Sequence, residues 1–377
     1  MGVDARLLGD RLTGVGRYVS ELCRELAVLL PEAEFLLYAP WPIRMPVSSS
    51  RWKMRIDPLA GILAGMRGLW MTKHAWMLLR VGALAARDRV NLFWVADFPF
   101  VPRIAREVPI VATVYDFRHR MTPGKMRRAA LYGRKVLERR AWRVDEFVAI
   151  SSGTAAKLRR FLGRDAAVIA RPAVSSCFTR RSEAEISEMC RRLGISRPYL
   201  LALSSMDPHK NIETLISVFA EMVERGSLRD HRLVLAGKGS EEMIGKTRLA
   251  HERLGERIKG LGFVRDDDLP ALYSGADLFV LPSLDEGFGI PVLEARACLT
   301  RVVASDLPEL REAGGDHAIY IAPTHKGIRE GILRGLSMAA PTGPGQLWTW
   351  RSSAEPIARL FVDSVERAGQ MKAAIWT

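Results

Sequence analysis

The chain has 377 residues, of which 48% are hydrophobic and 26% are charged, and its formal net charge is +14. Its length suits two domains of about 150–200 residues each, and its composition excludes disordered and fibrous proteins. The apolar runs are shorter than the roughly 18–20 residues that span a bilayer, the N-terminal residues do not resemble a signal peptide, and four scattered cysteines favour a reducing cytoplasm over a disulfide framework or a zinc site.

The first half of the chain alternates short apolar segments with longer amphipathic stretches. This alternation is typical of parallel βαβ units in a doubly wound sheet. The expected strands are Val3–Ala5, Glu34–Tyr38, Leu92–Val95, Ile110–Tyr115, Glu146–Ile150 and Val168–Ala170. The expected helices between them include Tyr18–Leu30 and Ala129–Arg143.

A second series of the same kind follows the loop Arg171–Ser187. We therefore predict an N-terminal Rossmann-like domain over residues 1–180, a second domain over 190–350 and a last helix within 351–377. Ligands of such sheets bind beyond the carboxyl ends of the strands, so a cleft between the domains is the expected site. The expected strands are Tyr199–Ser204, Arg232–Ala236, Ile258–Leu261, Leu278–Leu281, Val302–Ala304 and Ile319–Ile321, and the helices are Asn211–Arg225, Ser240–Leu254, Leu269–Ser274, Pro291–Cys298 and Ala354–Ala368.

The first stretch with chemical interest is "LTGVGRY", residues 12–18. Gly14 and Gly16 are expected between the first strand and the first helix, where glycines expose backbone N–H groups to an anion. Arg17 could hold a phosphate or an acceptor. The spacing is not GxGxxG, so a dinucleotide fingerprint is not supported, and an ordinary strand-to-helix turn is the alternative.

Residues 51–90 interleave tryptophan and methionine with basic residues, a pattern that suits a membrane interface. Residues 1–180 carry 31 Lys and Arg against 15 Asp and Glu, a net charge of +16, whereas residues 181–377 carry 25 against 27, a net charge of −2. A basic first half attracts anionic lipid, nucleic acid or a phosphorylated substrate. The alternative is a core rich in Met and Trp with a solvated basic face. The residues concerned are Trp52, Trp70, Trp76, Met54, Met66, Met71, Met77, Arg51, Lys53, Arg55, Arg67, Lys73 and Arg80.

Polar residues follow two of the strands expected in the first half. Tyr115 and Asp116 end the strand in "VATVYDFRHR", at the edge where ligands bind. Asp116 could orient a sugar hydroxyl, accept a proton or cap the next turn, and it is a better catalytic candidate than His119. Ser151 and Ser152 follow the next strand in the same way and could equally cap a helix.

The stretch "LALSSMDPHKN", residues 201–211, runs from a strand into a turn. His209 and Lys210 lie at the carboxyl end of that strand, and Asn211 could cap the following helix. A lysine at this edge can neutralise a diphosphate as a point charge. A surface lysine beside a helix start is the alternative.

Two carboxylates with seven residues between them, Glu286 and Glu294, mark the stretch "LPSLDEGFGIPVLEARA". Gly287 and Gly289 allow a sharp turn close to a ligand, and the proline that follows them fits the first turn of a helix. Both carboxylates should therefore lie near the carboxyl edge of the preceding strand, beside helix N–H groups that favour phosphate. The alternative is a polar loop with one glutamate on a helix surface.

Together these stretches resemble family 4 of the retaining nucleotide-sugar glycosyltransferases, which have the GT-B fold of two doubly wound Rossmann-like domains facing across a cleft. The opening resembles the subgroup that includes mannosyltransferases of bacterial surface polysaccharides. The segments that carry the resemblance are 4–18, 111–117, 150–158, 201–216, 233–239, 261–295 and 304–323.

The resemblance implies a role for each matching residue. Glu286 would contact the donor sugar near its reacting carbon, Glu294 would bind the nucleotide ribose, and Lys210 would bind the diphosphate. The amides near Gly14 and Gly16 would face donor phosphate and acceptor in the first, acceptor-binding domain, and the last helix would cross back onto that domain. The resemblance also implies donor contacts at Gly287, Phe288, Gly289, His209, Ser205, Gly237 and Lys238.

Two positions depart from the family pattern. Tyr115 stands where many members have a histidine, and Ser204–Ser205 stand where many have an arginine. His209 or Arg17 could supply the missing positive charge. These departures bear on acceptor orientation and diphosphate binding, and they leave the two glutamates in place.

The resemblance implies transfer of a hexose, most plausibly mannose from GDP-mannose, onto a lipid-linked saccharide in polysaccharide or O-antigen synthesis. No metal and no cofactor are expected, and the enzyme should sit on the cytoplasmic face of an anionic membrane through its basic first domain. The alternatives are a transferase that uses a UDP-sugar, a nucleotide-sugar epimerase, and a non-enzymatic nucleic-acid binder. The last is disfavoured because no nucleic-acid-binding motif is found.

Overall fold

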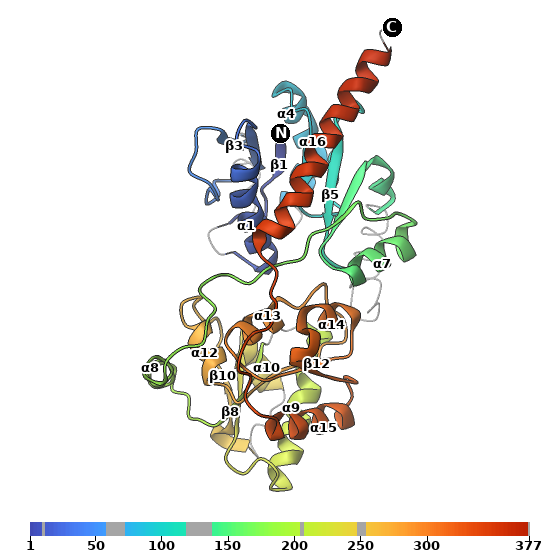
Figure 1. Ribbon diagram of the computed structural model, residues 1–377. Coiled ribbons are helices and arrows are strands. Elements are labelled where there is room, and N and C mark those ends of the chain that lie inside the picture. The colour runs from blue at the N-terminus through green and yellow to red at the C-terminus, as the bar shows by residue number, and fades with distance from the viewer. Residues whose placement is uncertain (10–11, 58–71, 118–137, 204–206, 247–253, 376–377) are drawn as a thin grey trace. The chain divides into compact units, whose positions relative to one another are not determined.

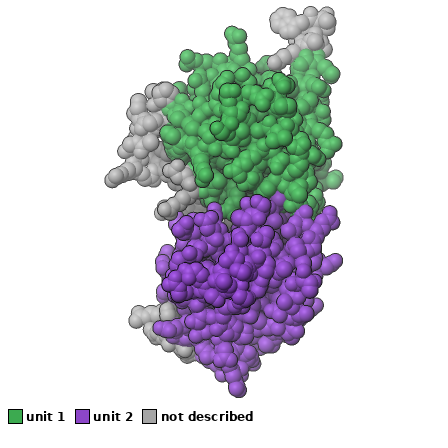
Figure 2. Space-filling view, turned by 60° about the vertical axis from the view of Figure 1, so that its left-hand side comes forward, with its two compact units in different colours: residues 1–172, 348–377 green, residues 173–347 purple. Residues whose placement is uncertain are grey.

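The computed structural model describes residues 1–9, 12–57, 72–117, 138–203, 207–246 and 254–375 (Figure 1). The chain divides into two compact units (Figure 2). The first unit consists of residues 1–172 and 348–377, and the second consists of residues 173–347. The chain therefore passes between the units twice.

A parallel sheet forms the centre of the first unit. Among the described residues its strand order is β3-β2-β1-β4-β5-β6-β7. The central strands β4 and β5 are short, apolar and fully buried, which suits a sheet covered on both faces, whereas the edge strand β3 carries two basic residues. The strands are β1 (Gly2–Asp4), β2 (Phe35–Ala39), β3 (Trp52–Ile56), β4 (Phe93–Val95), β5 (Ile110–Val114), β6 (Glu146–Ala149) and β7 (Val168–Ile169).

The helices of the first unit bury apolar stripes with helical spacing. In α1 (Gly14–Leu29), for example, Val19, Leu22, Cys23 and Leu26 are fully buried. The long helix α16 (Trp350–Ile375), red in Figure 1, packs against α1 and so belongs to this unit. The remaining helical segments are α3 (Thr72–Leu79), α4 (Val81–Arg87), the 3₁₀ turn η2 (Arg139–Arg143) and α7 (Ser152–Leu162).

The second unit repeats this architecture with a parallel sheet in the order β10-β9-β8-β11-β12-β13. Its strands are β8 (Tyr199–Leu203), β9 (Arg232–Ala236), β10 (Ile258–Gly260), β11 (Leu278–Leu281), β12 (Val302–Ser305) and β13 (Ala318–Ile321). Its helices are α8 (Glu183–Leu193), α9 (Ile212–Glu224), α10 (Ser240–Lys246), α12 (Leu269–Gly275), α13 (Ile290–Ala297), α14 (Pro308–Gly314) and α15 (His325–Ser337), with 3₁₀ turns η3 (Pro208–Lys210), η4 (Gly255–Arg257) and η5 (Gly315–His317).

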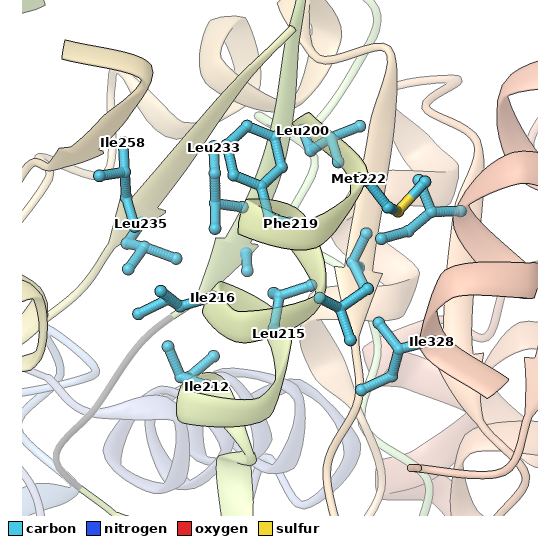
Figure 3. Packing of buried hydrophobic residues seen from close by; sticks show 14 of the residues in the cluster. Leu200, Ile212, Leu215, Ile216, Phe219, Met222, Leu233, Leu235, Ile258 and Ile328 are labelled. Atoms are coloured by element: carbon cyan, nitrogen blue, oxygen red, sulfur yellow. The ribbon is translucent and has the colours of Figure 1, made fainter. Parts of the chain in front are cut away.

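Helix α9 supplies much of the core on one face of this sheet (Figure 3). Its residues Ile212, Leu215, Ile216, Phe219 and Met222 recur at helical spacing and are at most 2% exposed. They pack against strand residues that include Leu200, Leu233 and Leu235. This packing holds the carboxyl ends of the strands in a fixed register.

The strands expected from the sequence are confirmed to within one or two residues at each end, but two local expectations are wrong and a third is largely untested. Helix α1 begins at Gly14, not at Tyr18, because Thr13 caps it by accepting a hydrogen bond from Gly16 N. Asn211 precedes α9 without a side-chain cap, because its backbone is left-handed with φ of 57° and its amide donates to Pro323 O. The predicted helix Ala129–Arg143 lies largely outside the described residues, and its end is the η2 turn.

The stretch assigned to a membrane interface holds the strand β3, which sequence analysis did not anticipate. Trp52 is 5% exposed and stacks on Phe35, with ring centroids 4.1 Å apart. Trp76 and Met77 are also buried, so these side chains belong to the core and are not presented to a bilayer. Trp70, Met66 and Met71 lie outside the described residues. No helix in the described part of the chain has the length and apolar character needed to cross a membrane.

Candidate functional site

The site in the second unit is built where β8 and β11 end. These strands are hydrogen-bonded neighbours and parallel, so the loops after them emerge at the same edge. Leu284 N donates to His209 O over 2.7 Å, which ties the two loops together. Side chains separated by more than seventy positions in the sequence therefore meet.

Glu286 and Lys210 form an ion pair at this edge. The sequence around either residue does not reveal this contact. Lys210 Nζ lies 2.6 Å from Glu286 Oε1, and Ser283 Oγ donates to the same oxygen over 2.7 Å. Burial alone would raise the pKa of Glu286, but the charge and hydrogen bond of Lys210 and the hydroxyl of Ser283 outweigh burial and hold the pKa below its ordinary value of 4.5. Glu286 is therefore a fixed carboxylate at neutral pH.

Replacing Lys210 with methionine should destabilise the second unit by about 3 kcal/mol at pH 7, since it leaves a buried carboxylate without its cation. The folded-state pKa of Glu286 is lowered, so its contribution to stability is complete above 4.5 and is lost as the pH falls through the lowered value. The difference in urea midpoint between wild type and Lys210→Met should accordingly shrink below pH 4.5. A difference independent of pH would contradict the ion pair.

A strained turn and a short helix follow Glu286. Gly289 has φ of 103° and precedes α13, and a Cβ on it would lie 2.5 Å from Leu310 Cδ2, so the turn requires glycine for both conformation and space. The proline lies in the first turn of α13, as expected. Glu294, on this helix, is 6% exposed. The Glu294 side chain faces the interior of the unit, so this residue does not lie on the exposed surface of the helix.

Tyr273, from α12, fixes Glu294. Its hydroxyl donates to Glu294 Oε2 over 2.8 Å, and Thr300 Oγ1 donates to the Tyr273 carbonyl over 2.7 Å. Tyr273 is fully buried. The sequence does not single out Tyr273, because a tyrosine on an apolar helix carries no signal that distinguishes it from a core residue.

On the ribose-binding role that the sequence resemblance implies for Glu294, Tyr273→Phe should weaken binding of a nucleotide donor about tenfold, because the hydrogen bond that orients the Glu294 carboxylate is worth on the order of 1–3 kcal/mol. The expected signature is a raised KM for the nucleotide donor with a nearly unchanged kcat. Thr300→Val removes the hydrogen bond from the Thr300 hydroxyl to the Tyr273 carbonyl. It should have a smaller effect on the same KM. A fall in kcat as large as the rise in KM in Tyr273→Phe would argue against an orienting role.

The other residues predicted in the second unit fall into three groups. His209 and Phe288 are buried, with 5% and 2% of their surface exposed. In the loop that holds the predicted donor contacts Gly237 and Lys238, Gly237 N donates to Gly262 O over 2.7 Å, whereas Lys238 is exposed. Ser205 lies outside the described residues.

The glycine loop of the first unit differs from the expectation. Gly14 and Gly16 lie in the first turn of α1 and not before it. A Cβ on Gly16 would lie 2.5 Å from Leu7 O, so this glycine is explained by close packing, and its amide already donates to Thr13. Arg17 is half-buried in the same turn. The role of this loop in anion binding stays a prediction.

The carboxyl edge of the first sheet holds Tyr115 and Asp116, as predicted. Asp116 is half-buried. Tyr115 packs edge-on against Tyr18, its hydroxyl has no hydrogen-bond partner among the described residues, and burial raises its pKa well above 10.0. Ser151 caps α7, so the capping alternative is confirmed for that residue.

A buried ion pair at the same edge was missed. Arg6 and Asp4 are joined by two hydrogen bonds of 2.8 and 2.7 Å, and Arg6 Nη1 donates to His74 Nδ1 over 2.7 Å. Burial opposes the charge of Arg6, but Asp4 outweighs it and the pKa of Arg6 is raised. The pair could have been suspected from two residues of opposite charge at the carboxyl end of a strand.

Among the residues that the structure describes, no group of three or more His, Cys, Asp or Glu side chains is placed to hold a metal ion. The positive charge at the edge of the second sheet comes from Lys210. The arrangement of a fixed carboxylate, a cation and a helix start suits a ligand that carries both hydroxyl groups and phosphate.

Comparison with protein families gives a match to "Glycosyl transferases group 1" over residues 191–338. The O-antigen chain mannosyltransferase B of Escherichia coli is 29% identical over 83% of this chain and 84% of its own length. The O-antigen chain mannosyltransferase RfbU of Salmonella typhimurium is 34% identical over 33% of this chain and 34% of its own length.

Among solved structures, WaaG, a glycosyltransferase involved in lipopolysaccharide biosynthesis, superimposes with a TM-score of 0.66 at 15% identity. The superposition covers 98% of this chain and 99% of WaaG. This likeness bears on the fold, and with two parallel-sheet Rossmann-like units it confirms the GT-B fold.

Proposed function

We propose that this chain, a glycosyltransferase with a group 1 domain at residues 191–338, moves a mannosyl unit from GDP-mannose onto a hydroxyl of a lipid-linked saccharide with retention of the α configuration. The product would be a polysaccharide or O-antigen chain. The two mannosyltransferase relatives support the sugar and the pathway.

The ion pair between Lys210 and Glu286 is the observation that carries the proposal. It places one cation and one fixed carboxylate at the carboxyl edge of a parallel sheet, where nucleotide ligands bind. Lys210 has three N–H donors, so it can hold Glu286 and a phosphate oxygen at once. Glu286 would accept hydrogen bonds from the hydroxyls of the donor sugar.

Departure of the nucleoside diphosphate develops negative charge on phosphate and positive charge on the sugar ring. Lys210 and the N–H groups at the start of α13 would stabilise the first, and the carboxylate of Glu286 would stabilise the second. The leaving phosphate oxygen can accept the proton of the acceptor hydroxyl on the same face. This route needs no separate pair of acid and base residues.

The acceptor and the membrane are assigned to the first unit in this proposal. Asp116, Arg17 and the amides near Gly14 would orient the acceptor, while Glu294, held by Tyr273, would bind the ribose. The excess of basic residues in 1–180 would hold the protein to the cytoplasmic face of an anionic membrane.

A melting-shift screen with GDP, UDP and ADP tests the donor, since a ligand that binds only the folded state raises the melting temperature. GDP should give the largest shift, and Glu294→Gln should abolish it. A shift with UDP alone would indicate that the donor is a UDP-sugar and not GDP-mannose. Transfer from radiolabelled donor with and without acceptor then separates a transferase from an epimerase.

The reaction should also proceed in EDTA, because a lysine and helix N–H groups can take the place of a metal ion at the diphosphate. We expect the initial rate in excess EDTA to stay within about twofold of the untreated rate, a difference under 1 kcal/mol in activation free energy. Loss of turnover that Mg²⁺ or Mn²⁺ restores would show that a metal takes part.

A further inference from the structure

One exposed tryptophan lies at the opposite edge of the first sheet from Asp116. Trp142 belongs to η2, which leads into β6, and Arg143 donates to Ile104 O in the loop that leads into β5. All strands of this sheet are parallel, so the segments that precede them share the amino edge. Asp145, just after Trp142, accepts a hydrogen bond from Ile110 N at the start of β5, which fixes this placement.

The Trp142 side chain is unusual in its exposure. It is 65% exposed, although its neighbours Ala141 and Val144 are buried. The guanidinium groups of Arg106 and Arg143 each lie 5.8 Å from the centre of its ring. An exposed indole with two cations near its ring has an apolar body and polar surroundings, the character of side chains that settle at a membrane interface.

Positive charge is concentrated around this ring. The pKa of Arg140 is lowered, first by burial and then by repulsion from Arg103. Of the nearby acids, Glu146 pairs with Arg367 at 2.7 Å and Asp165 pairs with Arg159 at 3.6 Å, whereas Glu107, next to Arg106, is exposed and offsets one of the positive charges. We define the Trp142 patch as Arg103, Arg106, Arg140, Trp142 and Arg143.

We propose that the Trp142 patch docks the first unit on a bilayer of anionic phospholipid, with the indole among the headgroups and the arginines on their phosphates. This inference deepens the membrane association in the proposed function and replaces residues 51–90 as its location. A single aromatic ring without a series of stacking partners suits a lipid surface better than a nucleic-acid strand. Docking through the amino edge leaves the side chains of the carboxyl edge uncovered.

Flotation of the full chain with vesicles tests the proposal. Binding to phosphatidylcholine vesicles that contain phosphatidylglycerol should be strong at low salt and weak at high salt. Trp142→Ala should lower the partition coefficient about tenfold, since an aromatic ring carries much of the apolar area of a contact. Arg106→Gln should lower it about fivefold, the effect of one cation near an anionic leaflet.

Two variants in the second unit are matched controls. Phe263→Ala removes an aromatic ring that is 63% exposed, and Arg265→Gln removes an arginine whose side chain is 76% exposed. Neither should change vesicle binding. Trp142→Phe should recover part of the loss in Trp142→Ala, and every variant should keep the melting shift with GDP, so failure of the donor assignment would be seen separately.

Three outcomes would overturn the proposal. If the protein bound pure phosphatidylcholine vesicles as strongly as anionic vesicles, the positive charge of the patch would have no role in docking. Wild-type vesicle binding by Trp142→Ala or by Arg106→Gln would show that the Trp142 patch is not the docking surface. Equal loss of heparin and vesicle binding in Arg106→Gln, with no effect of Trp142→Ala on either, would show a general polyanion surface with no insertion of the ring.

Discussion

Glu286→Gln should lower kcat by about 100- to 1,000-fold, the effect typical of removing one preorganised charged group from a transition state. The amide oxygen can still accept hydrogen bonds from Lys210 and Ser283, so the loop should keep its conformation. What is lost is the negative charge that the proposed function places beside the sugar ring. The measurement is the initial rate of transfer at saturating donor and acceptor.

Two other substitutions give this experiment its controls. Glu256→Gln changes an exposed glutamate in the same unit and should leave the rate unchanged. Glu294→Gln should raise the KM for the donor more than it lowers kcat, because Tyr273 places that carboxylate for binding. A Glu286→Gln enzyme that works at the native rate would refute the proposed role of the Lys210–Glu286 pair.

Phe219→Ala should destabilise the second unit by about 3–5 kcal/mol, the range for truncating a buried phenylalanine. Phe219 is fully buried on α9 against the sheet, in a cluster with Leu200 and Leu233 (Figure 3). The loss combines the transfer of the ring from water and the cavity left behind. At about 2–4 °C per kcal/mol for a unit of this size, the melting temperature should fall by roughly 10 °C.

Phe263→Ala is the matched control, since the same ring is removed from a position that is 63% exposed. Its melting temperature should stay within about 2 °C of wild type, as expected for most surface substitutions. Because the two units can unfold separately, the transition to follow is the one that GDP shifts. Equal destabilisation by both substitutions would contradict the packing around α9.

The elements of the fold could be predicted because each is encoded locally. Apolar runs of four or five residues gave the strands, and the 3.6-residue period gave helices such as α9. The strand β3 was missed because its sequence, Trp-Lys-Met-Arg-Ile, alternates basic and apolar residues as an interfacial segment also does. Only its pairing with β2 distinguishes the two.

Helix ends were predicted less well than strands. Tyr18 is a poor start signal, and the true start at Gly14 depends on the cap provided by Thr13. Asn211 has the residue type of a cap but the backbone of a left-handed turn. A side chain's capping role depends on the backbone angles around it, which the residue type alone does not give.

The sequence by itself determined the two parallel-sheet units, the carboxyl-edge positions of Glu286, Lys210 and Asp116, and the basic character of the first half, because strand pattern, turn residues and charge are local properties of the chain. Tertiary structure alone decided that Lys210 meets Glu286, that Tyr273 holds Glu294, that Trp52 and Trp76 are buried and that Trp142 is exposed. Contacts between residues far apart in sequence depend on which strands become neighbours. Burial depends on what packs against each side chain, and neither is written in the spacing of residues along one segment.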